Sequence, residues 1–288
     1  MLPRLVRIVL ALIITLSLVT SAAATTTKRV PRLIFPVVGT TSYYDDFGEP
    51  RAGGAHQGND ILAARHAPAV AVEAGTVEFW TTSVQAGCML YLHGDSGTTY
   101  LYIHLNNDLT GRNDNQGKCV PGTSYAPGLK DGARVAAGQL IGFVGDSGDA
   151  NGIHPHLHFE VHPNDGGAVD PYGYLRKAQQ LMFYAKPGAK VALSIGGTVV
   201  SAFGDKLELK TSQVQLNSGK PVKVSRPIVL SLAADARVLV DLPGVAVGLD
   251  ALLSGVYATV QTLPIRATIA AQRGDANVLT ASRIMLGG

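Results

Sequence analysis

The stretch that decides the fold is residues 145–163, GDSGDANGIHPHLHFEVHP. A turn rich in glycine and aspartate leads there into the alternating segment HLHFEVH. Side chains two residues apart in a β-strand project from the same face, so His156 and His158 are expected side by side, with Leu157 and Phe159 on the opposite face. Two neighbouring imidazoles on one strand face suit a metal site.

A second part of this site is expected in the segment AHQGNDI, where His56 and Asp60 lie four residues apart. That spacing brings two side chains to one face in a helix or a strand, but Gly58 and Asn59 disfavour the helix. The extended arrangement differs from the helical HExxH zinc motif, which this sequence lacks. Imidazole nitrogen and carboxylate oxygen are ordinary zinc ligands, and three protein ligands leave a fourth position for water, which is typical of catalysis.

Amide hydrolysis at a metal also needs side chains that accept and donate protons. His156, and His104 in the segment TTYLYIHL, are the candidates for these roles. Glu160 lies two residues beyond His158 on the same strand face, so it is a candidate to hydrogen-bond that imidazole from behind.

The remaining histidines are interpreted as exposed loop residues outside the site. They are His66, His93, His154 and His162. His154 precedes Pro155, which favours an extended or turn conformation. Its position close to HLH still makes it a competing ligand.

Short alternating segments surround these motifs between Gly-, Pro-, Asn- and Asp-rich turns: AVAVEAGTVEFW, MLYLHG, TTYLYIHL and QLIGFVG. They predict a mainly β chain whose residues 33–186 form an antiparallel domain with a substrate groove. Residues 111–132 are polar and are expected to form a surface loop that borders or covers this groove. Residues 187–288 alternate as well but carry no histidine, and they predict a second, β-rich accessory domain. Its final segment, from residue 258, is compatible with strands, and residues 248–256 are a candidate helix.

The N-terminus reads MLPRLVRIVLALIITLSLVTSAAATTT. Two arginines, an apolar run over residues 8–19 and then small residues predict a signal peptide, residues 1–24, followed by a linker, residues 25–32. The run is shorter than the roughly 20 residues that span a bilayer, so no membrane anchor is expected after cleavage. Because an exported chain meets an oxidising environment, Cys88 and Cys119 are predicted to form a disulfide.

The overall composition argues against nucleic acid as a partner. Charged residues make up 16% of the chain and the formal net charge is +3, far from the concentrated basic surface that nucleic-acid binding needs. The 46% hydrophobic content is sufficient for a buried core.

The chain resembles the lysostaphin/LytM-type zinc endopeptidases of bacterial cell walls in three motifs that occur in the family's order. These are HxxxD in HQGNDI, YxHL in YIHL, and the 145–163 segment followed by VDPYGYL. The resemblance covers about residues 33–175. It implies one Zn²⁺ per chain, bound by His56, Asp60 and His158, with His104 and His156 as catalytic groups beside the metal-bound water. It also implies hydrolysis of peptide bonds in peptidoglycan cross-links or stem peptides by a secreted, periplasmic or wall-associated enzyme.

Two other functions stay open at this point. The chain is alternatively a non-catalytic peptidoglycan-binding or hydrolase-activating module that retains the fold, or a protease that acts on proteins. The accessory domain is expected to aid placement on the wall or on another cell-wall protein. His154 and the long polar loop depart from the family pattern, so the substrate preference does not follow from the resemblance.

Overall fold

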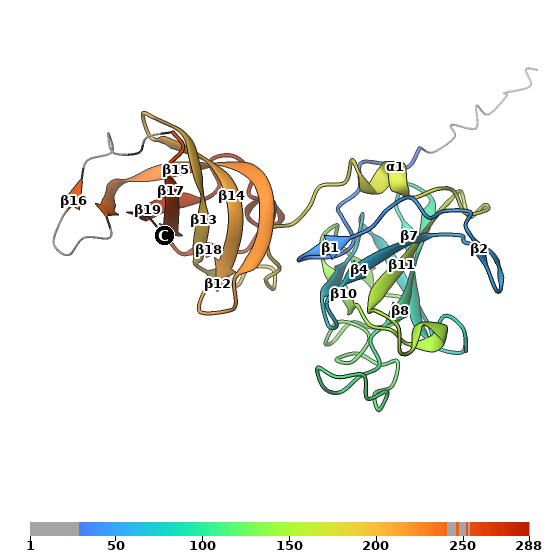
Figure 1. Cartoon of the computed structure of the whole chain (residues 1–288). Coiled ribbons are helices and arrows are strands. Elements are labelled where there is room, and N and C mark those ends of the chain that lie inside the picture. The colour runs from blue at the N-terminus through green and yellow to red at the C-terminus, as the bar shows by residue number, and fades with distance from the viewer. Residues whose placement is uncertain (1–28, 241–245, 248–251, 253, 288) are drawn as a thin grey trace, which may run out of the picture.

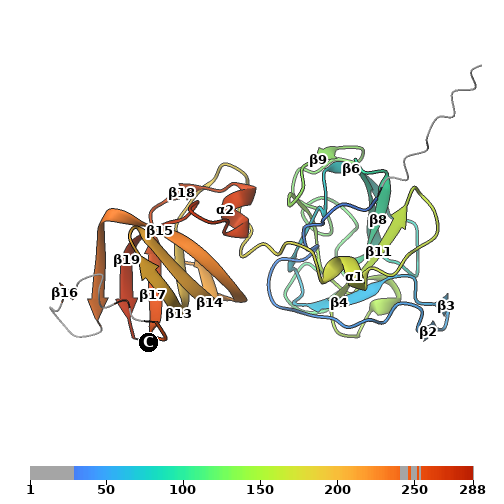
Figure 2. The same ribbon diagram turned by 90° about the horizontal axis from the view of Figure 1, so that it is seen from above.

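The computed structural model describes residues 29–240, 246–247, 252 and 254–287. The predicted signal peptide, residues 1–24, and most of the linker lie outside this range. Figures 1 and 2 show two β-rich bodies joined by the segment between helix α1 (Tyr172–Leu175) and strand β12 (Lys190–Val191). Each body has its own hydrophobic core. A search of the described residues found no helix long and apolar enough to cross a membrane.

The N-terminal body is built on one antiparallel sheet. In spatial order its strands are β1 (Thr41–Ser42), β4 (Asn59–Ala63), β11 (His156–Pro163), β8 (Thr98–Leu105), β7 (Cys88–Gly94), β6 (Gly75–Trp80) and β9 (Arg134–Val135). Two short antiparallel pairs accompany it: β2 (Pro50–Arg51) with β3 (Gly54–Ala55), and β5 (Pro68–Val70) with β10 (Leu140–Phe143). The predicted mainly β, antiparallel fold is therefore confirmed.

The register of strand β11 between β4 and β8 positions the histidines. His158 lies opposite Asp60 of β4 on one side and opposite Ile103 of β8 on the other. Leu157 and Phe159 point to the other face, where both are fully buried in the core. A slip of one residue would exchange the two faces, so the burial of these apolar side chains fixes the histidines on the open face.

The turn that feeds β11 is held between the ends of β7 and β8. It contains the 3₁₀ helix η1 (Gly148–Ala150). Gly148 has φ +79°, and a Cβ there would lie 2.1 Å from the carbonyl oxygen of Gln85, so only glycine fits. The hydroxyl of Ser147 donates to the carbonyl of Leu105 (2.5 Å) and accepts from the amide of Cys88 (2.9 Å).

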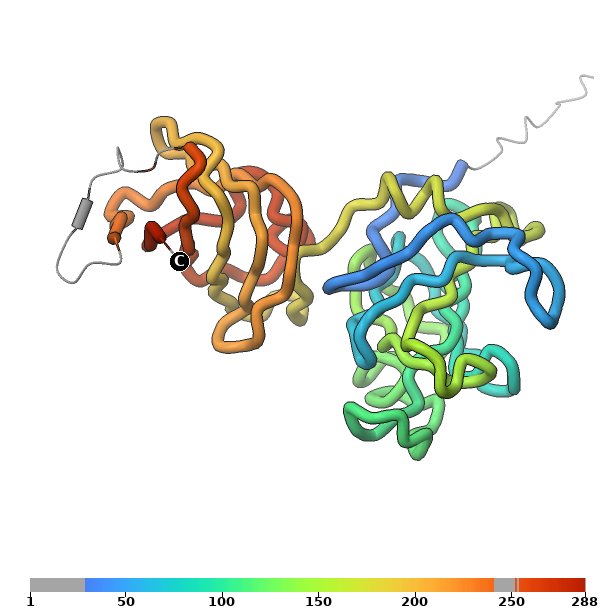
Figure 3. Tube along the Cα trace, in the orientation of Figure 1, coloured from blue at the N-terminus to red at the C-terminus, as the bar shows by residue number. Residues whose placement is uncertain are grey.

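The polar loop over residues 111–132 is tied to the sheet. Cys119 in the loop forms a disulfide with Cys88 of β7, with a Cα–Cα distance of 5.1 Å. Asn113 and Asn115 donate their side-chain amides to Oδ1 of Asn151 just after η1, at 2.9 and 3.0 Å. Figure 3 shows this part of the chain, in green, extending from the lower end of the N-terminal body.

The C-terminal body is a sheet that closes on itself. Its strands are β14 (Lys206–Leu216), β13 (Leu193–Phe203), β17 (Tyr257–Thr262), β19 (Thr280–Leu286), β15 (Val222–Val240) and β16 (Ala246–Val247), and a short pair joins β12 to β18 (Ile265–Arg266). Strand β15 pairs in parallel with β19. It also pairs, antiparallel, with β14, and this second pairing closes the sheet. The hydrophobic core of the C-terminal body already includes Met182, Phe183 and Ala185, which precede the predicted domain boundary at residue 187.

One segment of the C-terminal body differs from the prediction. The strand pattern expected over residues 258–288 is interrupted by the short helix α2 (Ile269–Arg273), and the helix considered over residues 248–256 falls largely outside the described residues. The Oγ1 of Thr268 caps it by accepting from the amide of Ala271 (3.1 Å), and Gly274 ends it in the left-handed conformation, φ +64°. The helix was missed because it is only about one turn long and lies between segments with a strand-like alternation of apolar and polar residues.

The disulfide is expected to contribute substantially to the stability of the N-terminal body. Replacing Cys88 and Cys119 together by alanine should lower its free energy of unfolding by about 2–4 kcal/mol, because the unfolded chain regains the freedom of a closed loop. Trp80 is the only tryptophan of the chain and lies in β6, so its emission during urea unfolding reports on this body. Reductant should shift the midpoint of the wild-type protein and leave the double variant unchanged; coinciding midpoints for both proteins would contradict the prediction.

Candidate metal centre

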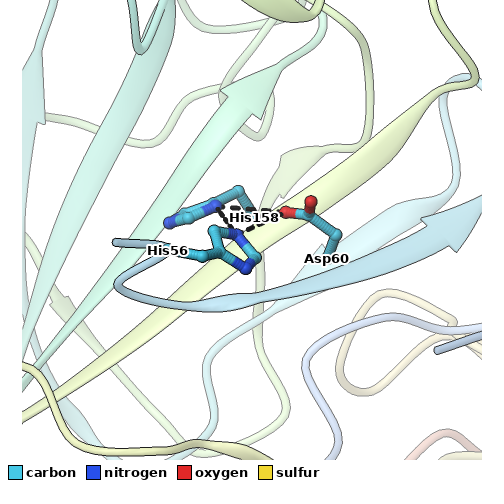
Figure 4. A group of neighbouring side chains, drawn as sticks. All are labelled: His56, Asp60 and His158. Atoms are coloured by element: carbon cyan, nitrogen blue, oxygen red, sulfur yellow. Dashed lines mark hydrogen bonds and ion pairs between the residues drawn. The ribbon is translucent and has the colours of Figure 1, made fainter. Parts of the chain in front are cut away.

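Three side chains from β4, β11 and the segment before β4 converge on one point. Nε2 of His56 lies 2.9 Å from Nδ1 of His158, and Oδ1 of Asp60 lies 3.2 Å from the first nitrogen and 3.1 Å from the second. Figure 4 shows the two rings and the carboxylate facing one another. Among the described residues, these three form the group whose ligand atoms are close enough to hold a metal ion.

Contacts behind the two imidazoles decide which nitrogens carry protons. Nδ1 of His56 lies 2.9 Å from the main-chain carbonyl of Asp46, and Nε2 of His158 lies 2.9 Å from Oε1 of Glu160. Carbonyl and carboxylate oxygens only accept hydrogen bonds, so these nitrogens are the donors. The nitrogens that face Asp60 are then left with lone pairs. Three electron-pair donors around one point call for a cation between them.

The pKa values of the converging side chains reflect the same excess of electron-pair donors. Burial alone would raise the pKa of Asp60, but hydrogen bonds to His158 and His56 hold it far below its usual range. Burial alone would lower the pKa of His158, but hydrogen bonds to Asp60 and Glu160 raise it to about 9. Without a metal ion, protons therefore bind where a cation would neutralise the lone pairs.

Glu160 is held in turn by His162, which the sequence interpretation had placed in an exposed loop. His162 lies in strand β11, and its Nε2 is 2.6 Å from Oε2 of Glu160. Burial would raise the pKa of Glu160, but hydrogen bonds with His158 and His162 lower it to about 2, so the carboxylate stays charged. The interpretation of His162 was wrong because strand alternation places it on the same face as His158 and Glu160.

The other three histidines lie apart from the converging atoms. His93 is an exposed residue of β7 and contacts Glu78 (2.9 Å), so it is not a loop residue either. His66 is half-buried and has φ +63°. His154 is exposed, as expected, and its Nδ1 contacts the carbonyl of Pro155 (2.9 Å).

His104 and His156 lie beside the three converging side chains. Their ring centroids are 5.0 Å apart, and Nε2 of His156 is 3.7 Å from Oδ1 of Asp60. Nδ1 of His104 donates to the carbonyl of Ser147 (2.8 Å) and Nδ1 of His156 to the carbonyl of His154 (3.0 Å). Both Nε2 atoms are therefore free to accept a proton.

Two features distinguish His104 from an ordinary strand histidine. Burial and the neighbouring His156 lower its pKa to about 4, so at neutral pH its imidazole is an uncharged base. Its backbone has φ +60°, a conformation that non-glycine residues rarely adopt and that clusters at functional sites. The hydrogen bonds to Ala86 and Ser147 hold it there.

Sequence reasoning missed how closely Gly58 and Asp46 support the site. A Cβ on Gly58 would lie 2.6 Å from Nε2 of His158 and 2.7 Å from the carbonyl of Phe159, so the imidazole occupies the space of a side chain. Asp46 is buried, and its carboxylate accepts from the side chain of Asn59 and from the amide of Asp60. The sequence did show a glycine between His56 and Asp60, but it was used only as an argument against a helix and not as a sign of close packing against another side chain.

The converging side chains lie in an open cleft with a cavity volume of about 550 Å³. Its rim is formed by the β2–β3 hairpin, residues 85–86 and the η1 turn. No residue of the 111–132 loop is part of the lining in the described structure, so the loop does not border the cleft as expected. The side chains of Asn113 and Asn115 instead tie the loop to Asn151, just after the η1 turn.

Replacing Gly58 by alanine should weaken metal binding about 10- to 100-fold, because the added methyl group displaces the His158 ring from Glu160. Competition with a chromogenic chelator measures the affinity. Gly111→Ala is the matched control, since Gly111 has an ordinary φ and nothing within 4 Å of the added atom. Equal affinities for the two variants would show that His158 does not hold the metal.

The segment of residues 145–163 lies within a match to a known protein family. The sequence model of Peptidase family M23 matches residues 122–171, a range that contains His156 and His158 but not His56, Asp60 or His104. The L-Ala–D-Glu endopeptidase of Bacillus subtilis (strain 168) is 28% identical over 162 residues, which are 52% of this chain and 44% of the relative. The chain thus spans less than half the length of that relative.

Two solved structures are similar to about half of the chain. The catalytic domain of the antimicrobial peptidase lysostaphin from Staphylococcus simulans is 27% identical, with 48% of this chain and 92% of that chain covered and a TM-score of 0.36. A putative glycyl-glycine endopeptidase lytM from Ruminococcus gnavus is 27% identical, with 50% and 59% covered and a TM-score of 0.39. The family match and the curated relative support a peptidase, and the family resemblance read from the motifs is confirmed: residues 122–171 carry the sequence of peptidase family M23.

Proposed function

We propose that this chain is an exported zinc metallo-endopeptidase that hydrolyses peptide bonds in the cross-links or stem peptides of bacterial peptidoglycan. The observation that carries the proposal is the convergence of His56, Asp60 and His158 in an open cleft, with two further imidazoles beside them. The M23 match and the curated relative, an L-Ala–D-Glu endopeptidase, support a peptide bond as the target.

The donor set fits zinc. A tetrahedral zinc ion with bonds of about 2.0–2.1 Å has ligand atoms about 3.3–3.4 Å apart, and imidazole nitrogen and carboxylate oxygen are among its usual ligands. The three facing atoms here are 2.9–3.2 Å apart, so small side-chain movements accommodate the ion. Bound there, zinc supplies a lowered pKa for water and polarisation of a substrate carbonyl. We propose His56, Asp60 and His158 as the ligands of one Zn²⁺ per chain.

His104 and His156 are proposed as the proton-transfer groups. Each has a free Nε2 on the cleft side of its ring and an Nδ1 anchored to a main-chain carbonyl, which fixes the ring orientation. One Nε2 accepts the proton of the attacking water, and the other, protonated from bulk solvent, donates a hydrogen bond to the developing oxyanion or gives its proton to the leaving amine. General acid–base catalysis of this kind contributes about 10²- to 10⁴-fold to the rate.

Export and domain roles complete the proposal. The order of charged, apolar and small residues over 1–24 supports a signal peptide, and the Cys88–Cys119 disulfide suits an oxidising compartment. Separate hydrophobic cores support two domains, for which the sequence predicts residues 33–186 (peptidase) and 187–288 (accessory), although the C-terminal core already begins at Met182. We propose that the accessory domain aids placement on the wall or on another cell-wall protein.

A non-catalytic scaffold is less well supported than an enzyme. A scaffold needs the fold but has no use for tautomers that leave lone pairs facing Asp60, nor for the strained backbone of His104. Both features are explained by a metal and by proton transfer, and each has supporting contacts of its own.

Metal removal should abolish the activity. Dialysis against 1,10-phenanthroline should stop the release of muropeptides from purified sacculi, and about one equivalent of Zn²⁺ per chain should restore it. Casein serves as the comparison substrate, because its degradation at a similar rate would favour the alternative of a protease that acts on proteins. Undiminished release by metal-free protein would contradict a zinc mechanism.

Single substitutions should separate metal binding from proton transfer. His158→Ala should lose both zinc and activity, whereas His156→Ala should retain zinc and lose about 10²- to 10⁴-fold in kcat. His93→Ala is the matched control, because His93 lies on the same sheet, outside the cleft lining, and contacts Glu78, Thr99 and the ring of Tyr91. Zinc content by elemental analysis and kcat on a soluble muropeptide give the two readouts, and full activity in His158→Ala would favour the scaffold alternative.

A further inference from the structure

The cleft around the candidate metal centre has a single arginine or lysine in its described lining. This residue is Arg51, at the end of β2. The acidic residues of the lining are Asp60, Asp149 and Glu160. Glu160 is already paired with His158 and His162, and Asp60 belongs to the metal centre. Arg51 is thus the lining group available to attract a negatively charged part of a ligand.

The guanidinium of Arg51 is only partly used within the protein. Its Nη2 lies 3.4 Å from a carboxylate oxygen of Asp46, 3.4 Å from Oδ2 of Asp60 and 3.5 Å from Glu49. These distances are long for hydrogen bonds, and all of them involve the same nitrogen. Nε and Nη1 contact no acceptor among the described residues, and the side chain is 43% exposed. The guanidinium can therefore form a two-pronged contact with an incoming carboxylate.

The cleft is also electrically polarised. A row of contacts runs from Arg51 to Asp60 (3.4 Å), from Asp60 to His156 (3.7 Å), and from His104 to Asp149 (3.7 Å). His156 and His104 are neighbours in the middle of this row. Asp149 at its far end is 66% exposed and would repel a substrate carboxylate, whereas the Arg51 end offers the Nε and Nη1 donors that its three carboxylate neighbours leave unused.

We propose that Arg51 binds a free carboxylate of the substrate next to the scissile bond, on the Asp60 side of the metal centre. Asp60 presents Oδ1 to the metal centre and Oδ2 to Arg51, so a group held by Arg51 lies close to the reacting carbonyl. The substrate is then an anionic stem peptide with free carboxylates, in preference to an uncharged glycine bridge. This inference rests on the proposed function and names the substrate class for the same site.

The test compares two synthetic stem peptides that are identical except that the free carboxylates of one are carboxamides in the other. Wild-type protein should prefer the acid form by about tenfold or more in kcat/KM, mainly through KM, as expected for a charge-assisted contact. Arg51→Gln should remove this preference, and Arg51→Lys should keep part of it. Arg112→Gln, an exposed arginine outside the cleft, should behave as wild type. Zinc content is measured for every variant to show that the metal centre is intact.

A binding measurement separates this inference from the proposed function. The affinities of His156→Ala for both peptides, with and without Arg51→Gln, are measured by calorimetry. If wild-type protein cleaves neither peptide, the proposed function fails, yet a preference for the acid peptide that is lost with Arg51→Gln still supports the role of Arg51. An unchanged ratio between acid and amide forms in the Arg51→Gln proteins overturns the inference, whether or not the peptides are cleaved.

Discussion

The cross-strand pairing of His158 with Asp60 is the constraint on which the rest of the site depends. Opposed positions on antiparallel strands bring an imidazole and a carboxylate together, and the hydrophobic face beneath them prevents any other register. His56 enters from the segment just before the same strand. The three converging side chains are thus placed by the ordinary requirements of a half-buried sheet.

A second set of contacts fixes the orientation and the protonated nitrogen of each imidazole in the cleft. Four imidazoles are each anchored by one nitrogen to a carbonyl or carboxylate oxygen, contributed by Asp46, Ser147, His154 and Glu160. Each anchor leaves the other nitrogen as a base that faces the cleft. Three of the four anchors are main-chain carbonyls, so they depend on backbone conformation and not on the identity of the side chain.

That distinction explains how far the sequence could be interpreted. Period-two alternation was sufficient to predict the β fold, whereas the choice of His56, Asp60 and His158, which do lie together, came from the family resemblance and not from spacing alone. The anchoring carbonyls, the fit of Gly58 against His158 and the position of Arg51 beside Asp60 depend on how separate strands approach, and no local pattern encodes that approach. His162 could have been identified from the sequence, because the alternation that placed Glu160 beside His158 continues to it.

The wide separation of the converging groups along the chain has a consequence for when the molecule becomes competent. Asp60 and His158 are 98 residues apart, so closing the loop between them is among the later steps of assembly. Until strands β4 and β11 are adjacent, no high-affinity site for an ion exists. For a chain exported in the unfolded state, as proposed, the ion site would therefore be completed only after translocation.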